Sequence, residues 1–388
     1  MHKADNILKN KNILVTGGTG FIGGRLIEIL ITKYGVNKIR VLVRNFAHGA
    51  RIARFPIEMF YGDITNSDSV DKACQDIDIV FNCVHDFTSR PNLQRQISID
   101  GTKILAKAIV KNKVKKLIHI STVAVYGLIK DGNINEIFPY RSCGDFYSKL
   151  KIKSDQIIKS YYRKYNLPAV ILQPTIVYGP YSTIWTTGPL SQLQSMLVPL
   201  VDGGNGVCNA VYIDDVVKAM ILSTTNENAT GETFLISGAN PVIWKEFYGY
   251  YENMLNIKST REIDSNELLN LFKKEKSNIK LFKDIASKII NDIELRQRIL
   301  ALGPFNLLRK YLSDFLWDKC KQKVLSNDPV HIQTKHLCLL DKYQIKFFQS
   351  KAVVSIEKAR KQLNYEPEFD FTRGMDLTAK WYYGIRDL

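Results

Sequence analysis

The sequence lacks several features that would place it in other classes of protein. Its six cysteines are scattered without a Cys-x-x-Cys pair, so reduced thiols in a cytoplasm fit better than a disulfide framework. Its six histidines are also scattered, and we find no metal-ligand spacing. No apolar run approaches the ~20 residues of a membrane span. The first residues contain no apolar signal core, and the chain has no internal repeats.

The chain has an excess of positive charge, with a formal net charge of +16 over 388 residues. An acidic ligand, an anionic membrane surface or nucleic acid would each be consistent with this balance. Because lysine and arginine are spread along the whole chain, a generally lysine-rich composition explains the excess equally well. The length predicts one large or two modest domains with ample core.

A glycine-rich segment near the N-terminus carries the first specific signal. An apolar strand over residues 12–16 runs into three glycines, and residues 25–32 then favour a helix. Gly17 allows a tight turn, Gly20 lets the backbone approach a pyrophosphate, and Gly23 lets helix and strand pack closely. The N–H groups of the helix N-terminus suit phosphates, whereas the alternative is a tight turn without a ligand. The predicted dinucleotide contacts are Gly17, Gly20, Phe21, Ile22 and Gly23.

The end of the second predicted strand bears on the choice between NAD and NADP. A carboxylate there would accept hydrogen bonds from the adenosine ribose and favour NAD. This chain has Arg44 after the strand at 39–43, preceded by Arg40. A guanidinium suits a 2′-phosphate, so we predict NADP(H), with NAD as the alternative if Arg44 only stacks on the adenine or faces solvent. Further on, Asp63 and Ile64 end the next apolar stretch, where Asp63 can reach the adenine amino group.

A second group of residues predicts proton transfer. Tyr147 and Lys151 are four positions apart, so they share one face of a helix. A nearby ammonium favours the phenolate and lowers the pKa of the tyrosine from its reference of about 10. Such a tyrosine can take a proton from an alcohol or give one to a ketone. Thr122, just after the apolar strand at 116–121, can hydrogen-bond the same oxygen. Most isolated Tyr-x-x-x-Lys pairs are solvated helix faces, but the combination with a glycine loop is far more specific.

Strand-like and helical runs alternate up to about residue 170, which predicts an α/β fold with a doubly wound parallel sheet. Right-handed crossovers place the cofactor at the carboxyl ends of the strands, beside the glycine loop. We expect a Rossmann-like dinucleotide-binding domain over 1–175, to which segments around 207–240 return. A smaller, mostly helical substrate lobe should occupy 176–388. The predicted strands lie at 12–16, 39–43, 57–61, 78–83, 115–121 and 168–173.

Short motifs along the chain match those of a known family. They are TGGTGFIG at 16–23, GD at 62–63, DGT at 100–102, STVAVYG at 121–127, YSKLK at 147–151, QPTIVYGP at 173–180, VYIDDV at 211–216, GETFLIS at 231–237 and SIEKARKQLNYEP at 355–367. On these motifs the chain resembles an extended short-chain dehydrogenase/reductase of the NAD-dependent epimerase/dehydratase type. The similarity runs over residues 11–245 and resumes around 350–385. The chain is therefore expected to be an enzyme.

The resemblance implies roles for individual residues. Thr122, Tyr147 and Lys151 would form the catalytic group, with Lys151 also holding the nicotinamide ribose. Pro174 and its neighbours would line the nicotinamide pocket. No metal is expected in the site.

Several positions depart from the pattern of the family. Ser98 stands where asparagine is common, so a helix-breaking residue in the proton path is missing. Val84 and His85 replace two small residues, and Gln173 replaces an arginine. Members that dehydrate nucleotide sugars carry an Asp-Glu pair directly after the catalytic Ser/Thr, where this chain has Val-Ala at 123–124. Because neither side chain can act as an acid or a base, a dehydratase is not expected.

Residues 256–345 look like an insertion, because family members are commonly shorter. The stretch is basic and favours several helices. Within residues 300–324, apolar side chains recur at a spacing of three to four between basic ones. Such a helix most often packs on its own domain. Contact with a second subunit or with an anionic membrane surface are the alternatives.

The leading functional interpretation is an NADP(H)-linked oxidoreductase or epimerase that acts on a secondary alcohol or ketone. The most favoured substrate is a nucleotide-activated sugar, since the family uses these most often and a basic chain suits a diphosphate. The alternative is a hydroxysteroid- or dihydroflavonol-type dehydrogenase of a hydrophobic alcohol. A non-catalytic protein that binds NADP or RNA is disfavoured because both Tyr147 and Lys151 are present. We further expect a cytoplasmic homodimer with no nucleic-acid partner, and peripheral membrane contact only if the 300–324 helix faces a membrane.

Overall fold

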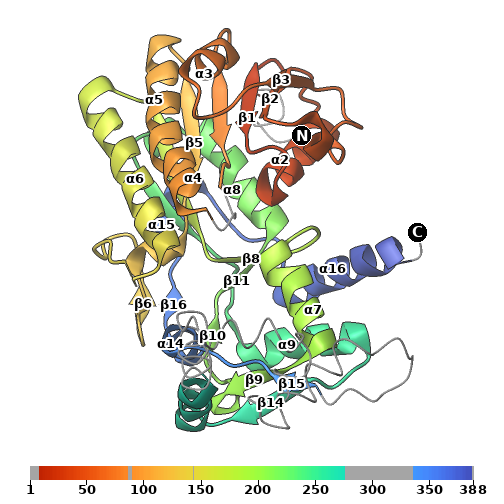
Figure 1. Cartoon of the computed structure of the whole chain (residues 1–388). Helices are drawn as coiled ribbons and strands as arrows, with labels where there is room; N and C mark the ends of the chain where they lie inside the picture. Colours follow the sequence, from red (N-terminus) through yellow and green to blue (C-terminus); the bar gives the residue numbers. More distant parts are fainter. Residues whose placement is uncertain (1–7, 86–89, 143, 276–334, 387–388) are drawn as a thin grey trace, which may run out of the picture.

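The computed structural model describes residues 8–85, 90–142, 144–275 and 335–386, and Figure 1 shows their arrangement. A seven-stranded parallel sheet has the strand order β12-β7-β5-β4-β1-β2-β3. Its strands are β1 Ile13–Thr16, β2 Ile39–Val43, β3 Glu58–Tyr61, β4 Ile79–Asn82, β5 Lys116–Ile120, β7 Ala169–Pro174 and β12 Thr233–Ile236. The order reverses between β1 and β4, so the sheet is doubly wound and Rossmann-like, as predicted.

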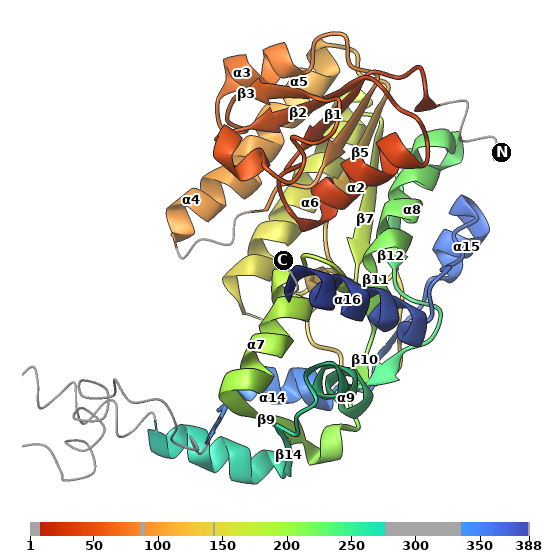
Figure 2. The same cartoon turned by 90° about the vertical axis from the view of Figure 1, so that its right-hand side faces the viewer.

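Helices cover both faces of this sheet. On one face α2 (Phe21–Thr32) packs against α8 (Ile213–Thr225). The other face is covered by α3 (Ser67–Ala73), α5 (Gly101–Lys111) and α6 (Phe146–Tyr165), which Figure 2 shows opposite α2 and α8.

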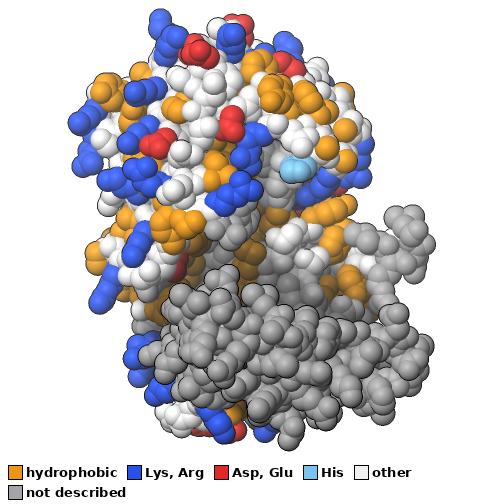
Figure 3. Space-filling view, viewed as in Figure 1, with side chains coloured by type: hydrophobic (Ala, Val, Ile, Leu, Met, Phe, Trp, Pro, Cys, Tyr) orange, Lys and Arg blue, Asp and Glu red, His pale blue; other side chains and the backbone are white. Residues whose placement is uncertain are grey.

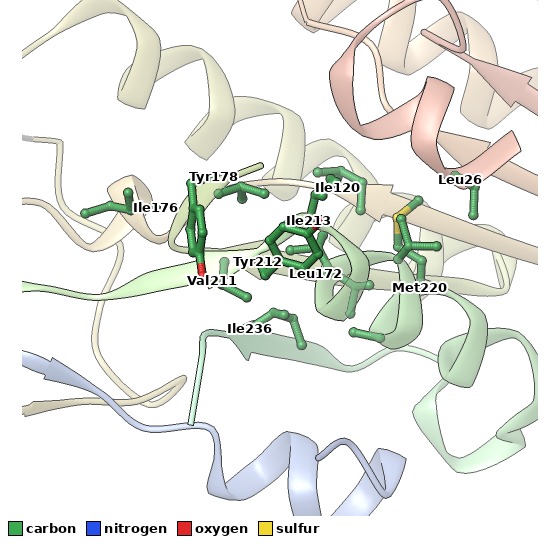
Figure 4. Packing of buried hydrophobic residues seen from close by; sticks show 14 of the residues in the cluster. Leu26, Ile120, Leu172, Ile176, Tyr178, Val211, Tyr212, Ile213, Met220 and Ile236 are labelled. Atoms are coloured by element: carbon green, nitrogen blue, oxygen red, sulfur yellow. The ribbon is translucent and has the colours of Figure 1, made fainter. Parts of the chain in front are cut away.

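Strand β1 shows why both faces are covered. Ile13 and Val15 belong to the core under α2 and α8, whereas Leu14 belongs to the core on the opposite side. Side chains alternate along a strand, so a strand that is apolar throughout must be buried on both faces. Figure 4 shows the first core, where Leu26 of α2 and Met220 of α8 meet Leu172 of the sheet.

The second lobe contains helices and several short strands. Strand β9 (Met196–Val201) lies between β14 (Thr260–Ile263) and β15 (His336–Leu337) in a small sheet. The helices of this lobe are α7 Gly188–Ser195, α9 Trp244–Leu255, α14 Lys342–Gln349 and α16 Phe371–Arg386, whereas α15 Glu357–Leu363 packs against β12 and α8. The remaining strands form the pairs β8 (Ile176–Tyr178) with β11 (Ala210–Tyr212), β10 (Val207–Cys208) with β13 (Val242–Ile243), and β6 (Asn133–Ile134) with β16 (Val353–Val354).

Helix α6 carries the predicted proton-transfer pair, and its ends are well defined. Asp145 caps the N-terminus by accepting a hydrogen bond from the Ser148 backbone N–H at 2.7 Å. Asn166 ends the helix in the left-handed conformation, with φ of 53°. A short helix, α4 (Pro91–Arg95), and a π-helical turn, η2 (Gln96–Asp100), precede α5, and η2 packs against α6.

Some expectations concern residues outside the described ranges. The amphipathic stretch at 300–324 lies outside them, as do the cysteines at positions 143 and 320. Within the described ranges no helix combines the length and the apolar character that a membrane span requires. The described cysteines, Cys74, Cys83, Cys208 and Cys338, form no disulfide.

Candidate active site

The glycine loop has the geometry that the sequence predicts. Gly17 has φ of +72°, and a Cβ there would lie 2.7 Å from the backbone of Cys83. A Cβ on Gly23 would lie 2.4 Å from the carbonyl oxygen of Gly17, so helix α2 and the loop touch at this point. Gly20 is the N-cap of α2 and would meet only the Gly17 carbonyl oxygen, at 3.2 Å. Two of the glycines thus serve packing, while Gly20 borders open space.

That open space belongs to a cavity of about 910 Å³, which extends from the carboxyl ends of the sheet to the second lobe. It follows the rule that ligands of doubly wound sheets bind where the strand order reverses. Gly23 and Asp63 do not line it. The predicted site residues that do are Gly17, Gly20, Phe21, Ile22, Arg44, Ile64, Thr122, Tyr147, Lys151 and Pro174.

Thr122, Tyr147 and Lys151 meet in the middle of this cavity. Thr122 caps the 3₁₀ turn η3 (Val123–Tyr126), where its Oγ1 accepts from the Ala124 backbone N–H at 3.2 Å. Thr122 lies beside Tyr147, near enough for its hydroxyl to lower the pKa of the phenol. Lys151 is buried, and its Nζ donates to the Ile120 carbonyl at 3.0 Å. Two hydroxyls and an ammonium therefore border one space that a substrate oxygen can enter.

The pKa of Tyr147 differs from the sequence expectation. Burial raises it to about 12, although the hydroxyl of Thr122 opposes this rise. The 36% of Tyr147 that is exposed faces the cavity, so the protein still desolvates its hydroxyl. The predicted lowering by Lys151 is absent here, because the ammonium is directed to the Ile120 carbonyl. The phenol is consequently protonated and ready to act as an acid.

The two arginines of strand β2 have different surroundings. Arg40 is engaged away from the cavity, with its Nε 2.8 Å from Glu58 and hydrogen bonds to the Ala73 and Gln75 carbonyls. Arg44 is exposed at the cavity rim, and no described carboxylate forms an ion pair with it. Only Arg44 is therefore placed to meet a ligand at the end of β2.

Asp63 does not point into the cavity, although its neighbours Gly62 and Ile64 line it. Its Oδ1 accepts from the backbone N–H of Thr65 at 2.8 Å and from the Thr65 hydroxyl at 2.7 Å. This turn directs the carboxylate toward its own loop. The contact with the adenine amino group remains a prediction.

The positions that depart from the family pattern have structural roles. Ser98 lies in the π-helical turn η2, and its carbonyl accepts from the Thr102 and Ser154 hydroxyls. Gln173 is fully buried and hydrogen-bonds Tyr126. Val84, His85, Val123 and Ala124 line the cavity.

The half of the cavity formed by the second lobe was not foreseen from the sequence. Its walls are mostly aromatic or aliphatic, and several come from α14, far along the chain from the catalytic residues. Among the described lining residues, Arg44 and Lys151 alone are lysine or arginine. The apolar lining residues of this half include Trp185, Pro189, Val198, Tyr248, Leu340, Tyr343, Phe347 and Phe348.

Comparison with known proteins places these observations in a family. The sequence model of the NAD dependent epimerase/dehydratase family matches residues 13–237. N-acetyl-alpha-D-glucosaminyl-diphospho-ditrans,octacis-undecaprenol 4-epimerase of Escherichia coli O157:H7 is 26% identical over 230 residues, which are 58% of this chain and 66% of that protein. The match thus spans less than two thirds of that relative.

Two further similarities extend over nearly the whole chain. Decarboxylating sterol-4-alpha-carboxylate 3-dehydrogenase of Candida albicans is 23% identical over 397 residues, covering 96% of this chain and 97% of that protein. The crystal structure of the dTDP-glucose 4,6-dehydratase DesIV of Streptomyces venezuelae matches with a TM-score of 0.67 at 20% identity, covering 97% of this chain and 98% of that one. The structural match confirms the fold.

Proposed function

Because the chain belongs to the NAD-dependent epimerase/dehydratase family, we propose that it is an NAD(P)-dependent oxidoreductase or epimerase that interconverts a secondary alcohol and a ketone. The observation that carries the proposal is that Thr122, Tyr147 and Lys151 line the same cavity as the glycine loop. A nicotinamide dinucleotide fits this cavity, because Gly20 leaves open space where a pyrophosphate would approach the N-terminus of α2. When bound, it would donate or accept the hydride.

The residues of the chain supply the proton. In the reductive direction Tyr147 gives its phenolic proton to the ketone oxygen as the hydride reaches the carbon, and the raised pKa of Tyr147 keeps that proton available. Thr122 hydrogen-bonds the same oxygen and fixes its position. Lys151, which lines the same cavity, would hold the nicotinamide ribose. Val123 and Ala124 provide no further acid or base, so the proposal includes no dehydration.

For the cofactor we propose NADP(H). The guanidinium of Arg44 is exposed at the rim beyond β2, where a 2′-phosphate of the adenosine ribose would lie. No described carboxylate competes for it. NAD remains the alternative, since the family as a whole is NAD-dependent.

We expect Arg44→Asp to shift the cofactor preference from NADP toward NAD. The carboxylate would repel the 2′-phosphate and accept hydrogen bonds from a free ribose, and the loss of one charged hydrogen bond is worth ~1.5–3 kcal/mol, or about tenfold to a hundredfold in affinity. Fluorescence titration with both cofactors measures the change. Arg40→Asp is not a clean control because Arg40 pairs with Glu58. Arg163→Asp serves instead, since Arg163 is exposed on α6 and forms no ion pair with a described carboxylate. A wild type that binds NAD more tightly than NADP would contradict the proposal.

The first candidate substrate is a sugar attached to a diphosphate, most simply a nucleotide-activated sugar. The Escherichia coli relative supports this class, because its name describes a sugar carried on a lipid diphosphate. The positive charge of the chain also suits such a ligand. Many of the basic side chains, however, stand on the outer surface over α5 and α6, as Figure 3 shows.

The second candidate is a hydrophobic alcohol, and the walls of the cavity favour it. Trp185, Phe347 and Phe348 line the half that faces the catalytic residues, and no described lysine or arginine there would meet a diphosphate. Unpaired burial of phosphate charge is costly, whereas an apolar substrate gains from contact with such walls. The Candida albicans relative, whose similarity includes α14, is named as a dehydrogenase of a sterol.

One experiment separates the two substrates. Any dinucleotide that copurifies is first identified in an extract of the denatured protein. UDP- and dTDP-sugars and 3-hydroxysterols are then screened for changes in the absorbance of the reduced nicotinamide. Turnover of either class with NADP(H) supports the proposed reaction and assigns the substrate. Failure to bind any nicotinamide dinucleotide would refute it.

We also propose that the chain works in the cytoplasm as a homodimer. The free cysteines among the described residues are consistent with a reducing compartment. Light scattering during gel filtration would give the number of subunits.

A further inference from the structure

Behind the catalytic lysine lies a buried group of polar side chains that the proposed reaction does not use. Asp155 stands one turn after Lys151 on α6 and is fully buried. His119 on β5 is also buried, and its Nε2 lies 3.7 Å from Asp155 Oδ1. Neither atom has a hydrogen-bond partner among the described residues. Because unpaired polar atoms at this depth are rare and costly, the two atoms require a physical explanation.

The surrounding hydrogen bonds fix the tautomer of His119. Asn82 Oδ1 accepts from the Thr16 hydroxyl at 2.8 Å and from the Val84 N–H at 3.4 Å. The amide nitrogen of Asn82 is therefore the donor to His119 Nδ1, which lies 3.0 Å away. A neutral imidazole that accepts at Nδ1 carries its proton on Nε2. Burial keeps this imidazole neutral, since it lowers the pKa of His119 to about 3. The Nε2 proton thus faces Asp155.

Burial raises the pKa of Asp155, whereas the hydrogen bonds from Ser121, Gln173 and Tyr140 and the charge of Lys151 lower it. The geometry of its hydrogen bonds favours the ionised form. Its Oδ2 accepts hydrogen bonds from Ser121 Oγ at 2.9 Å, Tyr140 Oη at 3.0 Å and Gln173 Nε2 at 3.0 Å. A proton on Oδ2 would conflict with these donors. A proton on Oδ1 would meet the Nε2–H of His119 and find no acceptor. Donors thus face both oxygens, and such an arrangement stabilises a carboxylate.

Lys151 is the cation that this carboxylate balances. It shares its face of α6 with Asp155, four positions away, and both His119 and Asn82 join Lys151 in lining a small polar cavity of about 10 Å³. We propose that Asp155, kept ionised by His119 and by its other donors, is a positioning residue that keeps Lys151 protonated in the active site. The inference rests on the proposed function only for the catalytic role of Lys151.

The direction of the effect on Lys151 follows from its surroundings. Burial lowers the pKa of Lys151, and the negative charge of Asp155 opposes this by raising it. Loss of that charge therefore lowers the pKa further, so Lys151 would lose its proton at a lower pH.

Other ionisable groups face the cluster from the neighbouring elements. Burial raises the pKa of Cys83, after β4, and of Tyr147, on α6, to about 12 in each case. It raises the pKa of Tyr126 on η3 and of Tyr140 above the ordinary range. Lys159 on α6, whose pKa burial lowers, is the other cation near Asp155. Because Lys159 is also affected by Asp155, the protonation of each lysine must be measured separately.

Lysine labelling tests the inference without a substrate. The full-length protein is treated with acetic anhydride over a pH series, and mass spectrometry gives the modified fraction of each lysine. We expect Asp155→Asn to lower the labelling midpoint of Lys151 by about one to two pH units, because loss of a nearby opposite charge shifts a pKa by about this much. Lys116 serves as an internal control. It is buried and hydrogen-bonds Thr230, and its midpoint should not move.

The matched control variant is Asp71→Asn. Asp71 is a carboxylate on α3 that pairs with Lys111, so its removal changes the net charge equally without touching the site. An unchanged Lys151 midpoint in folded Asp155→Asn would overturn the inference, as would an equal shift in Asp71→Asn. Replacement of Tyr147 by phenylalanine tests the proposed function separately, and it should leave the midpoint of Lys151 nearly in place.

A measurement on the wild type covers the case in which Asp155→Asn does not fold. Nitrogen-15 NMR of labelled histidine reports the tautomer of each ring, and His119 is assigned by the loss of its signals in His119→Gln. We expect a neutral ring protonated on Nε2 from about pH 5 to pH 9, a range in which an ordinary histidine titrates. A ring protonated on Nδ1, or one that titrates in this range, would overturn the inference.

Discussion

Tyr147→Phe is expected to lower turnover by about 10²–10⁴-fold, the usual contribution of a positioned acid or base. The phenol lies in the cavity beside Thr122, and its raised pKa keeps a transferable proton on it. The ring itself should stay in place, because it packs edge-on against His85 with ring centroids 4.8 Å apart. Dinucleotide affinity and melting temperature should therefore change little. The turnover is measured with the substrate found in the screen, from the absorbance of the reduced nicotinamide.

Tyr161→Phe provides the matched control for this change. Tyr161 lies on the same helix α6 but stacks near Tyr165, away from the cavity. Loss of its hydroxyl should leave turnover unaltered. If Tyr147→Phe kept more than about a tenth of the wild-type rate, general acid catalysis by this residue would be ruled out.

The central sheet could be predicted from the sequence because its signals are local. Five strands, β1, β2, β4, β5 and β7, are short apolar runs that are almost wholly buried, whereas the edge strand β3 is partly exposed. The predicted bounds of these six strands differ by about one residue from the observed ones. Strand β6 is the exception, since it has two residues and pairs with β16 from the far end of the chain. Two residues are too few to show the alternation of apolar and polar side chains that marks a strand, and the partner strand β16 is more than 200 positions away.

The proposed catalytic pair, Tyr147 and Lys151, could be derived from the sequence because spacing along one helix decides which side chains share a face. The same spacing of four extends from Tyr147 and Lys151 to Asp155, so the position of Asp155 on this helix face could also be derived from the sequence. Its ionised state could not be, because that state depends on His119 and Gln173 from two different strands. The raised pKa of Tyr147 was missed for a related reason, since desolvation depends on the whole cavity and outweighs one neighbouring charge.

The substrate half of the cavity shows where sequence reasoning ends. Helix α14 follows a long stretch without matching motifs, and nothing in its residues indicates that Tyr343 and Phe347 face the site. They do so because β15 pairs with β9 and brings the chain back beside Trp185. Long-range strand pairing of this kind leaves no local signal, so the apolar lining of this half of the cavity had to be read from the structure.

Gly20→Ala is expected to weaken dinucleotide binding by about tenfold to a hundredfold, equivalent to ~1.4–2.7 kcal/mol, without loss of the fold. The backbone of Gly20 has φ of −84°, which alanine adopts without strain. Its Cβ would meet one protein atom, the Gly17 carbonyl oxygen at 3.2 Å, and otherwise enter the cavity. The methyl group would then occupy the space through which a pyrophosphate approaches the N-terminus of α2. Titration of NADPH fluorescence gives the affinity, and thermal melting reports the fold.

Two further glycine variants separate binding from packing. In Gly23→Ala the new Cβ would lie 2.4 Å from the Gly17 carbonyl oxygen, so the protein itself should lose stability. In Gly35→Ala the Cβ meets nothing within 4 Å, and only the φ of +60° adds a modest cost far from the cavity. Weakened binding in Gly20→Ala with a melting temperature close to that of the wild type would assign the loop to the cofactor. Unimpaired binding of both NADPH and NADH in that variant would mean that the loop is a tight turn alone, and the proposed reaction would lose its cofactor site.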